Sequence, residues 1–510
     1  MKNQLKAGAI LSYTALIINS LISILYTPIM LNLLGQSEYG LYSLANSATG
    51  YIGVLNFGLG NAVIRYTAKY KALNDEESCS RIYGMFFRMY FVLGLIALLA
   101  GSFLTWNSGT IFGSSLTVHE QKTLEVLMAI VTLNLSLGIG LGLFSVIVLA
   151  HEKFIFQKLV VIAGSIISPL VMLPLLIMGY GTVAMVTITA IINIVTIFLN
   201  AFYCFRFLRI KISFKKVENS LFKEVMFFSS YIFLNLIISK LYDTTDQVLL
   251  GIYSGTAAIS IYAIGTMFTG YFSGFSSAIS NVFLSKVTRM TTKETSDEEL
   301  SNLFIRIGRL QYIVVSFALS GFIVFGKEFI ILWVGKDYEL SYTIAIIILI
   351  PMIVSLLQSM GGVILQAKNM QKFKTIINAA VAVGNVFLSI LFVQWWGPVG
   401  AAIGTAIAFF IGNVLIINIY YWKKIQINIP DFWKNIILMS VPLIISLLFG
   451  FTINGKFPVD SWLLFAIKIS IFTLVFLILM WITAMNRYEK ELITFPLHYY
   501  FKKRLQGKGI

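Results

Sequence analysis

The sequence predicts an all-α polytopic membrane protein of about 14 transmembrane helices, arranged as two six-helix lobes plus two C-terminal helices. Three observations lead to this fold class. The composition is strongly apolar, apolar runs of helical membrane-spanning length recur along the chain, and segments about 220 residues apart resemble each other. Each observation supports a different part of the prediction.

The composition is that of a chain embedded in lipid. Of the 510 residues, 58% are hydrophobic and 12% are charged, whereas soluble domains have roughly 45–50% apolar and about 25% charged residues. We therefore expect no large soluble domain. The net charge of +16 would suit nucleic-acid binding in a soluble protein, but here the positive residues are spread over short loops between spans. No nucleic-acid partner is expected.

The apolar runs divide the chain into fourteen expected spans. A helix needs about 20 apolar residues to cross roughly 30 Å of hydrocarbon. Runs of this length, bounded by charge, Gly or Pro, lie near residues 8–32, 40–62, 84–105, 126–149, 157–178, 182–204, 224–250, 256–284, 309–333, 341–366, 374–395, 398–421, 435–453 and 461–484. Most of the 38 Lys and Arg residues fall on the side of Met1, and such loops face the cytoplasm. Both termini are therefore expected to be cytoplasmic.

An internal repeat relates the two halves of the chain. Residues 41–53 align with residues 261–273 at an offset of 220, which matches Tyr42 with Tyr262 and Tyr51 with Tyr271. Six spans separate the copies, so both halves enter the membrane in the same direction and a pseudo-twofold axis along the membrane normal relates them. The expected domains are an N-terminal lobe at 1–215, a C-terminal lobe at 216–424, two additional helices at 425–486 and a basic cytoplasmic tail at 487–510. Such repeats are associated with alternating access.

Five segments carry a resemblance to a known family: residues 27–44, 56–70, 246–265, 331–342 and 395–408. In order and spacing they resemble the Wzx-type oligosaccharide flippases, members of the multidrug/oligosaccharidyl-lipid/polysaccharide exporter superfamily. The resemblance implies a multi-pass protein of the bacterial cytoplasmic (inner) membrane. It also implies that the substrate is an undecaprenyl-diphosphate-linked oligosaccharide for surface polysaccharide such as O-antigen or capsule. Polysaccharide polymerase machinery is a possible further partner.

The seventh span contains a concentrated group of charges inside a span. At 100° per residue, Lys240, Asp243 and Asp246 share one helix face with Gln247 nearby. Charges within a membrane span usually face water or a partner and serve a function. We expect Lys240 to attract an anionic substrate and Asp243 or Asp246 to bind or release a coupling ion, H⁺ or Na⁺. The alternative is a structural Lys240–Asp243 ion pair, with Asp246 solvated near the outer interface.

Other candidate contacts lie at span ends and on polar faces. Cations at the cytoplasmic ends of spans could receive the diphosphate or headgroup, or could serve only to set topology: Arg65, Lys153, Lys286, Arg289 and Lys372. Amides within spans could bond sugar hydroxyls, or could bond across packed helices: Asn46, Asn56, Gln358, Gln366 and Asn385. Lys468 in the last span could snorkel to the interface.

Two other classes of function fit the sequence less well. A drug or cation antiporter of the same superfamily often uses an acidic residue in the first span, and residues 8–32 contain no Asp or Glu. A membrane-embedded polysaccharide-synthesis enzyme would be expected to show a larger extramembrane loop with clustered acids or arginines. The sequence shows no P-loop, HExxH or GxSxG pattern, so we expect no catalytic residues, no metal and no cofactor other than the coupling ion.

Overall fold

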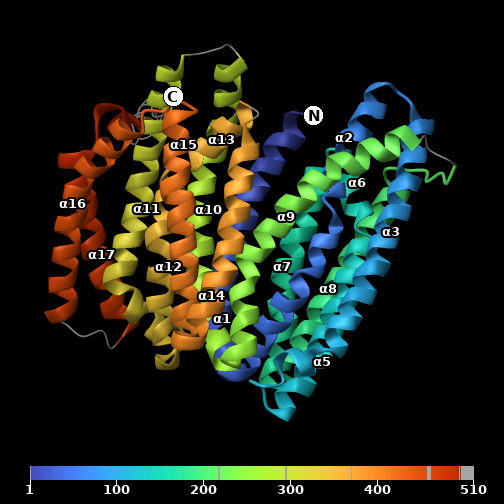
Figure 1. Ribbon diagram of the computed structural model, residues 1–510, viewed down its shortest axis with the longest axis horizontal. Helices are drawn as coiled ribbons and strands as arrows, with labels where there is room; N and C mark the ends of the chain where they lie inside the picture. The colour runs from blue at the N-terminus through green and yellow to red at the C-terminus, as the bar shows by residue number, and fades with distance from the viewer. Residues whose placement is uncertain are drawn as a thin grey trace, which may run out of the picture. The chain divides into compact units, whose positions relative to one another are not determined.

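The computed structural model describes residues 2–215, 219–292, 296–368, 370–456, 461–492 and 494, and the assigned secondary structure in these ranges is helical. Figure 1 labels most of the elements. In chain order they are α1 Lys2–Gly50, η1 Ile52–Asn56, α2 Leu59–Ala72, α3 Glu76–Trp106, α4 Ser108–Phe112, α5 Val118–Gly140, α6 Leu143–Ala150, α7 Phe154–Ile177, α8 Gly181–Arg206, α9 Asn219–Tyr253, α10 Thr256–Thr292, α11 Asp297–Val334, η2 Lys336–Tyr338, α12 Glu339–Leu357, α13 Ser359–Ala367, α14 Gln371–Phe409, η3 Phe410–Ile416, α15 Ile417–Lys423, α16 Ile429–Lys456, α17 Trp462–Leu479 and η4 Met480–Ala484.

The expected spans all fall on helices. Within the described residues, eleven helical runs are long and apolar enough to cross a membrane. Two of them each contain two expected spans, joined at Gly35 with φ 79° and at Gly397 with φ 53°, where a positive φ favours glycine. The remaining span, 256–284, lies on the 37-residue helix α10. The predicted fold class of a polytopic all-α membrane protein is confirmed.

Three expected spans are interrupted, which the sequence did not predict. The second span breaks at Phe57 and Gly58, whose φ angles are 54° and 64°. The fourth begins earlier than expected, with α5 at Val118, and breaks at Leu141; the tenth breaks at Gln358. Leu141 and Gln358 lie 217 residues apart, close to the repeat offset. A stacked ring pair also recurs at that separation, because Phe156–Tyr203 and Phe373–Tyr420 both have centroids 3.9 Å apart.

The chain packs as two compact units: Met1–Ala263 with Ala382–Gly404, and Ile264–Val381 with Thr405–Ile510. We call them unit 1 and unit 2. Helix α9 packs on α1 and α2 within unit 1, so the division by packing does not follow the expected lobe boundary at 216, and the lobes remain a prediction from the repeat. Most of the expected tail at 487–510 lies outside the described residues.

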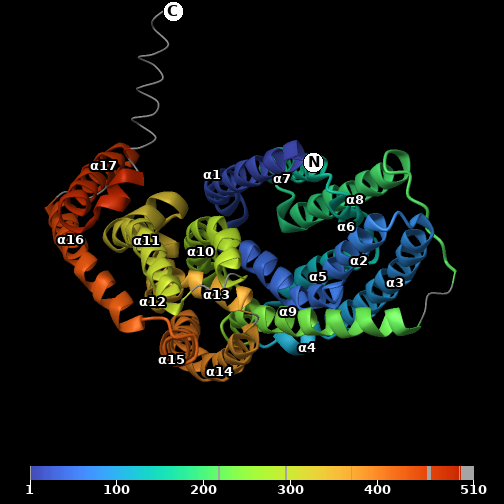
Figure 2. The same ribbon diagram turned by 90° about the horizontal axis from the view of Figure 1, so that it is seen from above.

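The core of unit 1 lies where α2, α3, α6 and α8 meet. Its fully buried side chains include Leu59, Phe86 and Ile147. Helices α3 and α5 approach so closely that a Cβ on Gly94 would lie only 2.7 Å from the Cα of Gly140. Figure 2 shows α2, α3, α5 and α6 gathered in this part of the molecule. Small residues that let backbones approach are typical of helix packing in membranes.

In unit 2, helix α11 packs against α12, α16 and α17. A buried ion pair ties the end of the last helices to α11. Arg309 Nε donates to Glu489 Oε1 at 2.6 Å, and its Nη2 donates to the carbonyl of Ala484 at 2.9 Å. The side chains are 11% and 0% exposed. The two additional helices are therefore anchored by charge as well as by apolar packing.

Candidate functional site

The four residues predicted on the face of α9 separate by depth. Asp246 is 3% exposed and Gln247 is half-buried, whereas Lys240 is half-buried and Asp243 is exposed. Ser239 donates to Asp243 Oδ2 at 3.2 Å. Lys240 Nζ lies near the end of the first helix, 3.8 Å from where a Cβ on Gly50 would be. This face therefore has an exposed part at Asp243 and a buried part at Asp246, and we call Lys240, Asp243, Asp246 and Gln247 the α9 stripe.

The buried part of the stripe is held by hydroxyl groups from other helices. The Tyr262 hydroxyl donates to Asp246 Oδ2, and the Ser47 hydroxyl donates to Gln247 Oε1. One turn away, the hydroxyls of Tyr51 and Thr245 are 2.6 Å apart. The expectation that Asp246 is solvated near an interface is wrong, because the tertiary structure buries its carboxylate and supplies a hydrogen-bond donor. Roles for Lys240, Asp243, Asp246 and Gln247 in coupling stay predictions.

At one end of unit 1, a hydrogen-bond cluster centred on Glu120 joins several helices. Ser37 donates to Glu120 Oε1 at 2.6 Å and Thr256 donates to the same oxygen at 2.8 Å. Oε2 accepts from the backbone N–H and the hydroxyl of Thr117, at 2.9 and 2.8 Å, in a capping box that begins α5. One carboxylate therefore joins α1, α5 and the start of α10. We call Ser37, Thr117, Glu120 and Thr256 the Glu120 cluster.

A second carboxylate at this end, that of Glu38, binds the start of α8. Glu38 Oε2 accepts from the backbone N–H of Thr182 at 2.9 Å and from its hydroxyl at 3.2 Å. Glu38 follows Ser37 directly, so adjacent residues bind three different helix starts. A carboxylate at a helix N-terminus is stabilised by the free N–H groups and the helix dipole. The four loops that the charge pattern assigns to the outer side before residue 260 thus meet at one end of unit 1.

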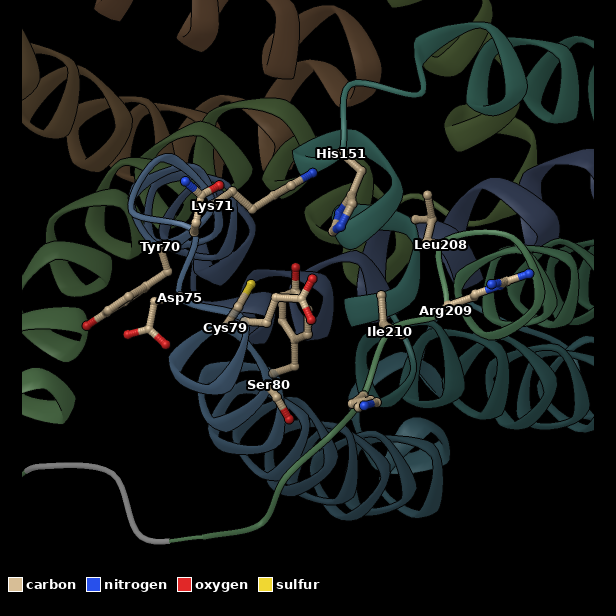
Figure 3. A pocket seen from close by; sticks show the side chains of 13 residues that line it. Tyr70, Lys71, Asp75, Cys79, Ser80, His151, Leu208, Arg209 and Ile210 are labelled. Atoms are coloured by element: carbon tan, nitrogen blue, oxygen red, sulfur yellow. The ribbon is translucent and has the colours of Figure 1, made fainter.

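The opposite end of unit 1 carries a pocket of about 250 Å³ between loops expected to be cytoplasmic. Its basic lining residues are Lys71, His151, Arg209 and Lys211. Figure 3 shows the Lys71 and His151 side chains reaching the same rim, with Arg209 directed away from the centre. Burial lowers the pKa of His151, and the charge of Lys71 lowers it further. The pocket therefore has a cationic rim beside a largely neutral histidine at pH 7.

Acidic groups balance part of this rim. Asp75 accepts from the backbone N–H of Ser78 at 2.9 Å and caps α3. Hydrogen bonds from the side chain and backbone of Ser78 hold the pKa of Asp75 below its usual value. The segment after α8 is fixed beside α3, because the backbone N–H of Ser213 donates to the carbonyl of Ser80 at 3.0 Å. The pocket is thus formed by three loops held in place by the backbone.

The five cations predicted to meet a diphosphate do not form one cluster within either unit. In unit 1, Arg65 lies 3.9 Å from Glu224 and its guanidinium covers the ring of Phe228 at 5.2 Å, while Lys153 begins α7. In unit 2, three members are exposed on α10 and α14: Lys286, Arg289 and Lys372. Arg65 thus contacts α9 through an exposed ion pair and a ring contact, and headgroup contact and a purely topological role both stay predictions for all five.

The predicted amides divide into exposed and packed groups. Asn46, Asn56 and Gln366 are exposed, although the amide of Asn46 donates to the carbonyl of Tyr42 at 2.8 Å. Gln358 is 3% exposed and exchanges hydrogen bonds of 2.7 and 3.1 Å with Asn418. Asn385 is fully buried. The structure favours the packing interpretation for Gln358, and sugar contacts stay predictions.

Lys468 does not snorkel. Its side chain is 2% exposed, and Nζ donates to Asn454 Oδ1 at 3.3 Å. The amide of Asn454 in turn donates to Glu328 Oε1 at 2.7 Å. The last helix is therefore linked to α11 through a partly buried polar chain, and the expectation of an interfacial ammonium is corrected.

The family of the chain follows from comparison with known proteins. The sequence profile of the family described as polysaccharide biosynthesis protein matches residues 5–284, more than half of the chain. The chain belongs to this family. A relative from Shigella flexneri described as a putative O-antigen transporter is 22% identical over 396 residues, covering 76% of this chain and 90% of the relative. A probable low-salt glycan biosynthesis flippase of Haloferax volcanii is 23% identical over 41% of this chain and 44% of that protein.

Solved structures place this polysaccharide biosynthesis protein in a known fold. The lipid II flippase MurJ in an inward closed conformation superposes with a TM-score of 0.73 at 19% identity, covering 95% of this chain and 99% of that one. An inward-facing multidrug resistance transporter of the MATE family gives 0.61 at 15% identity, covering 81% and 99%. At these identities the likeness concerns the fold.

Several residues of this family member were not anticipated. The sequence contained a signal for Glu120, because Thr117 followed three residues later by Glu120 is the capping-box pattern. No local signal marked Tyr262 or Ser47 as partners of the α9 stripe, since they lie 16 and 200 residues from Asp246 and Gln247. The sequence places three of the pocket's cations in loops but does not indicate that they line one pocket: Lys71, Arg209 and Lys211.

Proposed function

We propose that the protein is a flippase for an undecaprenyl-diphosphate-linked oligosaccharide. It would move the repeat unit from the cytoplasmic to the outer leaflet of the bacterial inner membrane for O-antigen or capsule synthesis, with both termini in the cytoplasm. The family match over residues 5–284 is the observation that carries this proposal. The relatives with which the chain aligns are described as a transporter and a flippase, not as enzymes.

Moving a sugar diphosphate across hydrocarbon requires features that unit 1 contains. Sugars and a diphosphate lose their hydrogen bonds to water in hydrocarbon, at several kcal/mol for each unsatisfied group, whereas the polyprenyl tail can stay in lipid. A flippase therefore needs a polar path and two ends that open in turn. The α9 stripe supplies intramembrane charge, the Glu120 cluster closes the predicted outer end, and loop cations stand at the other.

Asp246 is our candidate for coupling to an H⁺ or Na⁺ gradient. A buried carboxylate that can exchange a proton or cation gains or loses charge inside the membrane, which changes the energy of its surroundings. Its hydrogen bond from Tyr262 links that charge to α10, the helix that follows. Asp243, which is exposed on the same helix, would exchange the proton or cation with the polar path. A polymerase that uses the delivered oligosaccharide is the expected downstream partner.

Reconstitution into liposomes tests the function. The probe is the undecaprenyl-linked oligosaccharide extracted from cells that lack this gene, labelled at its terminal sugar. We expect wild-type protein to move the label to the outer leaflet, Asp246→Asn to lose its response to an imposed gradient, and Asp337→Asn, in η2 of unit 2, to keep it. Transport of small cationic dyes without movement of the lipid-linked sugar would instead favour an antiporter.

A further inference from the structure

A second cavity lies in unit 1, and none of its lining residues belongs to α9. Its volume is about 390 Å³, within the range of roughly 300–1,000 Å³ usual for small-molecule sites. Its walls come from η1, α3, α5, α6 and α8. Four asparagines and a tyrosine dominate its polar lining, and we call the cavity the amide pocket: Asn56, Tyr90, Asn134, Asn193 and Asn200.

Helical spacing and two helix breaks create the amide pocket. On α8, Asn193, Thr196 and Asn200 follow a three-and-four-residue spacing and share one face. On α5, Asn134 and Gly138 do the same. The chain then breaks at Leu141 and restarts as α6, and residues on both sides of the break line the pocket.

Three polar atoms of lining residues have no hydrogen-bond partner among the described residues. They are the Asn134 Oδ1, the Asn200 Oδ1 and the Tyr90 hydroxyl. Asn200 is 3% and Tyr90 1% exposed. The amide N–H of Asn200 already donates to the carbonyl of Thr196 at 2.8 Å, which leaves its oxygen as the free acceptor. An unsatisfied buried polar group costs about 1–3 kcal/mol, so such a cluster indicates a missing ligand or water.

The second half of the chain shows that this openness is not required by the fold. There the break at Gln358 is filled, because Gln358 and Asn418 bond to each other and the Trp433 indole donates to Asn418 Oδ1 at 3.1 Å. Asn418 lies 218 residues after Asn200, close to the repeat offset. The same architectural position thus has satisfied amides in one half and unsatisfied amides in the other.

The lining chemistry selects the class of ligand. None of the lining residues is Asp, Glu, Lys, Arg or His, so the pocket offers no counter-charge for a diphosphate. Its amides and hydroxyls both donate and accept, which suits the adjacent hydroxyl groups of a sugar ring. Leu135, Ile139 and Ile197 supply apolar surface for the C–H face of such a ring. We propose that the amide pocket binds a neutral sugar residue of the carried oligosaccharide, an inference that rests on the proposed function.

Gly138 allows the pocket to be filled without disturbing its walls. A Cβ added there meets no atom within 4 Å, so a leucine side chain would enter open space. Replacing a glycine within a helix also favours helix formation by about 1 kcal/mol, and the variant should remain folded. Gly384, in the helix α14, has the same open surroundings and does not line the pocket. Gly384→Leu is therefore the matched control.

The liposome assay with the extracted lipid-linked oligosaccharide distinguishes the outcomes. We expect Gly138→Leu to lower the transport rate about tenfold, because its side chain takes up space that the sugar would need, and Gly384→Leu to leave it unchanged. If wild-type protein moves no lipid-linked sugar, the proposed function falls and this inference falls with it. If wild-type and Gly138→Leu proteins transport equally well, only the amide pocket proposal is overturned.

A second variant separates binding from structure. Asn200→Leu with Asn134→Leu replaces unsatisfied amides by apolar groups of similar size. We expect its unfolding temperature to be equal to or above that of the wild type, while transport of the oligosaccharide falls. A lower unfolding temperature with unchanged transport would assign the amides to packing. A change in Na⁺ dependence alone, with the same dependence on oligosaccharide concentration, would identify a cation site and overturn the proposal.

Discussion

Tyr262 donates a hydrogen bond to the carboxylate of Asp246, which is 3% exposed. Tyr262 is also the residue that the internal repeat matches with Tyr42. The bond ties the predicted coupling residue to the helix that follows it. The free energy of this hydrogen bond determines whether a change of charge at Asp246 can move α10.

We expect the two residues to be energetically coupled. A hydrogen bond to a charged group contributes about 1.5–3 kcal/mol, so Tyr262→Phe and Asp246→Asn should destabilise non-additively by about 1–3 kcal/mol. Thermal unfolding of the wild type, both single variants and the double variant in detergent measures this coupling. Additive effects would show that the bond does not link charge to structure.

Removing the acceptor of the Glu120 cluster should open the predicted outer end. Ser47 is 6% exposed, so Ser47→Cys should react slowly with a membrane-impermeant maleimide in cells. Adding Glu120→Ala removes the partner of Ser37 and Thr256, and we expect labelling about tenfold faster, equivalent to roughly 1.4 kcal/mol. Glu125→Ala, one turn along the same helix, is the control and should leave labelling slow. Equal labelling in both would mean that the cluster does not close this end.

The buried Arg309–Glu489 pair should be required for stability. Removing one partner leaves an unpaired buried charge, which costs about 3–5 kcal/mol, so Glu489→Ala should lower the unfolding temperature sharply. The exposed Arg487–Glu491 pair nearby has side chains that are 93% and 60% exposed, and such pairs contribute about 0.3–0.5 kcal/mol. Glu491→Ala is therefore the matched control. Similar shifts for both variants would contradict the assigned role.

His151 should make stability depend on pH. Burial lowers its folded-state pKa below the usual value of 6.5, so below that value the unfolded chain binds a proton that the folded chain resists. Stability should therefore fall as the pH drops below about 6.5, and the loss should be complete below the folded-state pKa. We expect unfolding temperatures at about pH 7.5 and pH 5.5 to differ less in His151→Gln than in the wild type. His119→Gln, at an exposed site, should keep the wild-type difference.

Much of the fold was predictable because it depends on length and polarity. An apolar run long enough to cross hydrocarbon must form a helix, since the backbone has no other partner there. The joints at Gly35 and Gly397 lie between expected spans, because the apolar runs that define those spans end on either side of them. The breaks at Leu141 and Gln358 were missed, because apolar residues continue through both and hydropathy does not register a local change in hydrogen bonding.

The candidate site was predictable only in part. Charges on α9 were assigned to one face correctly, because helical geometry places residues three and four apart together. Burial of Asp246 and exposure of Asp243 could not be derived, since both depend on which helices cover each turn. Gln358 shows the same limit: its amide is satisfied by Asn418, 60 residues away.

The sequence by itself determined that this chain crosses a membrane many times, that its halves are related, and that one span carries intramembrane charge. These properties depend on local composition and spacing. Only the tertiary structure decided that Asp246 meets Tyr262, that Glu120 joins three helix ends, and that the amides of unit 1 surround an open pocket. Each of these depends on contacts between helices distant in sequence, whose geometry follows from packing and not from any local pattern.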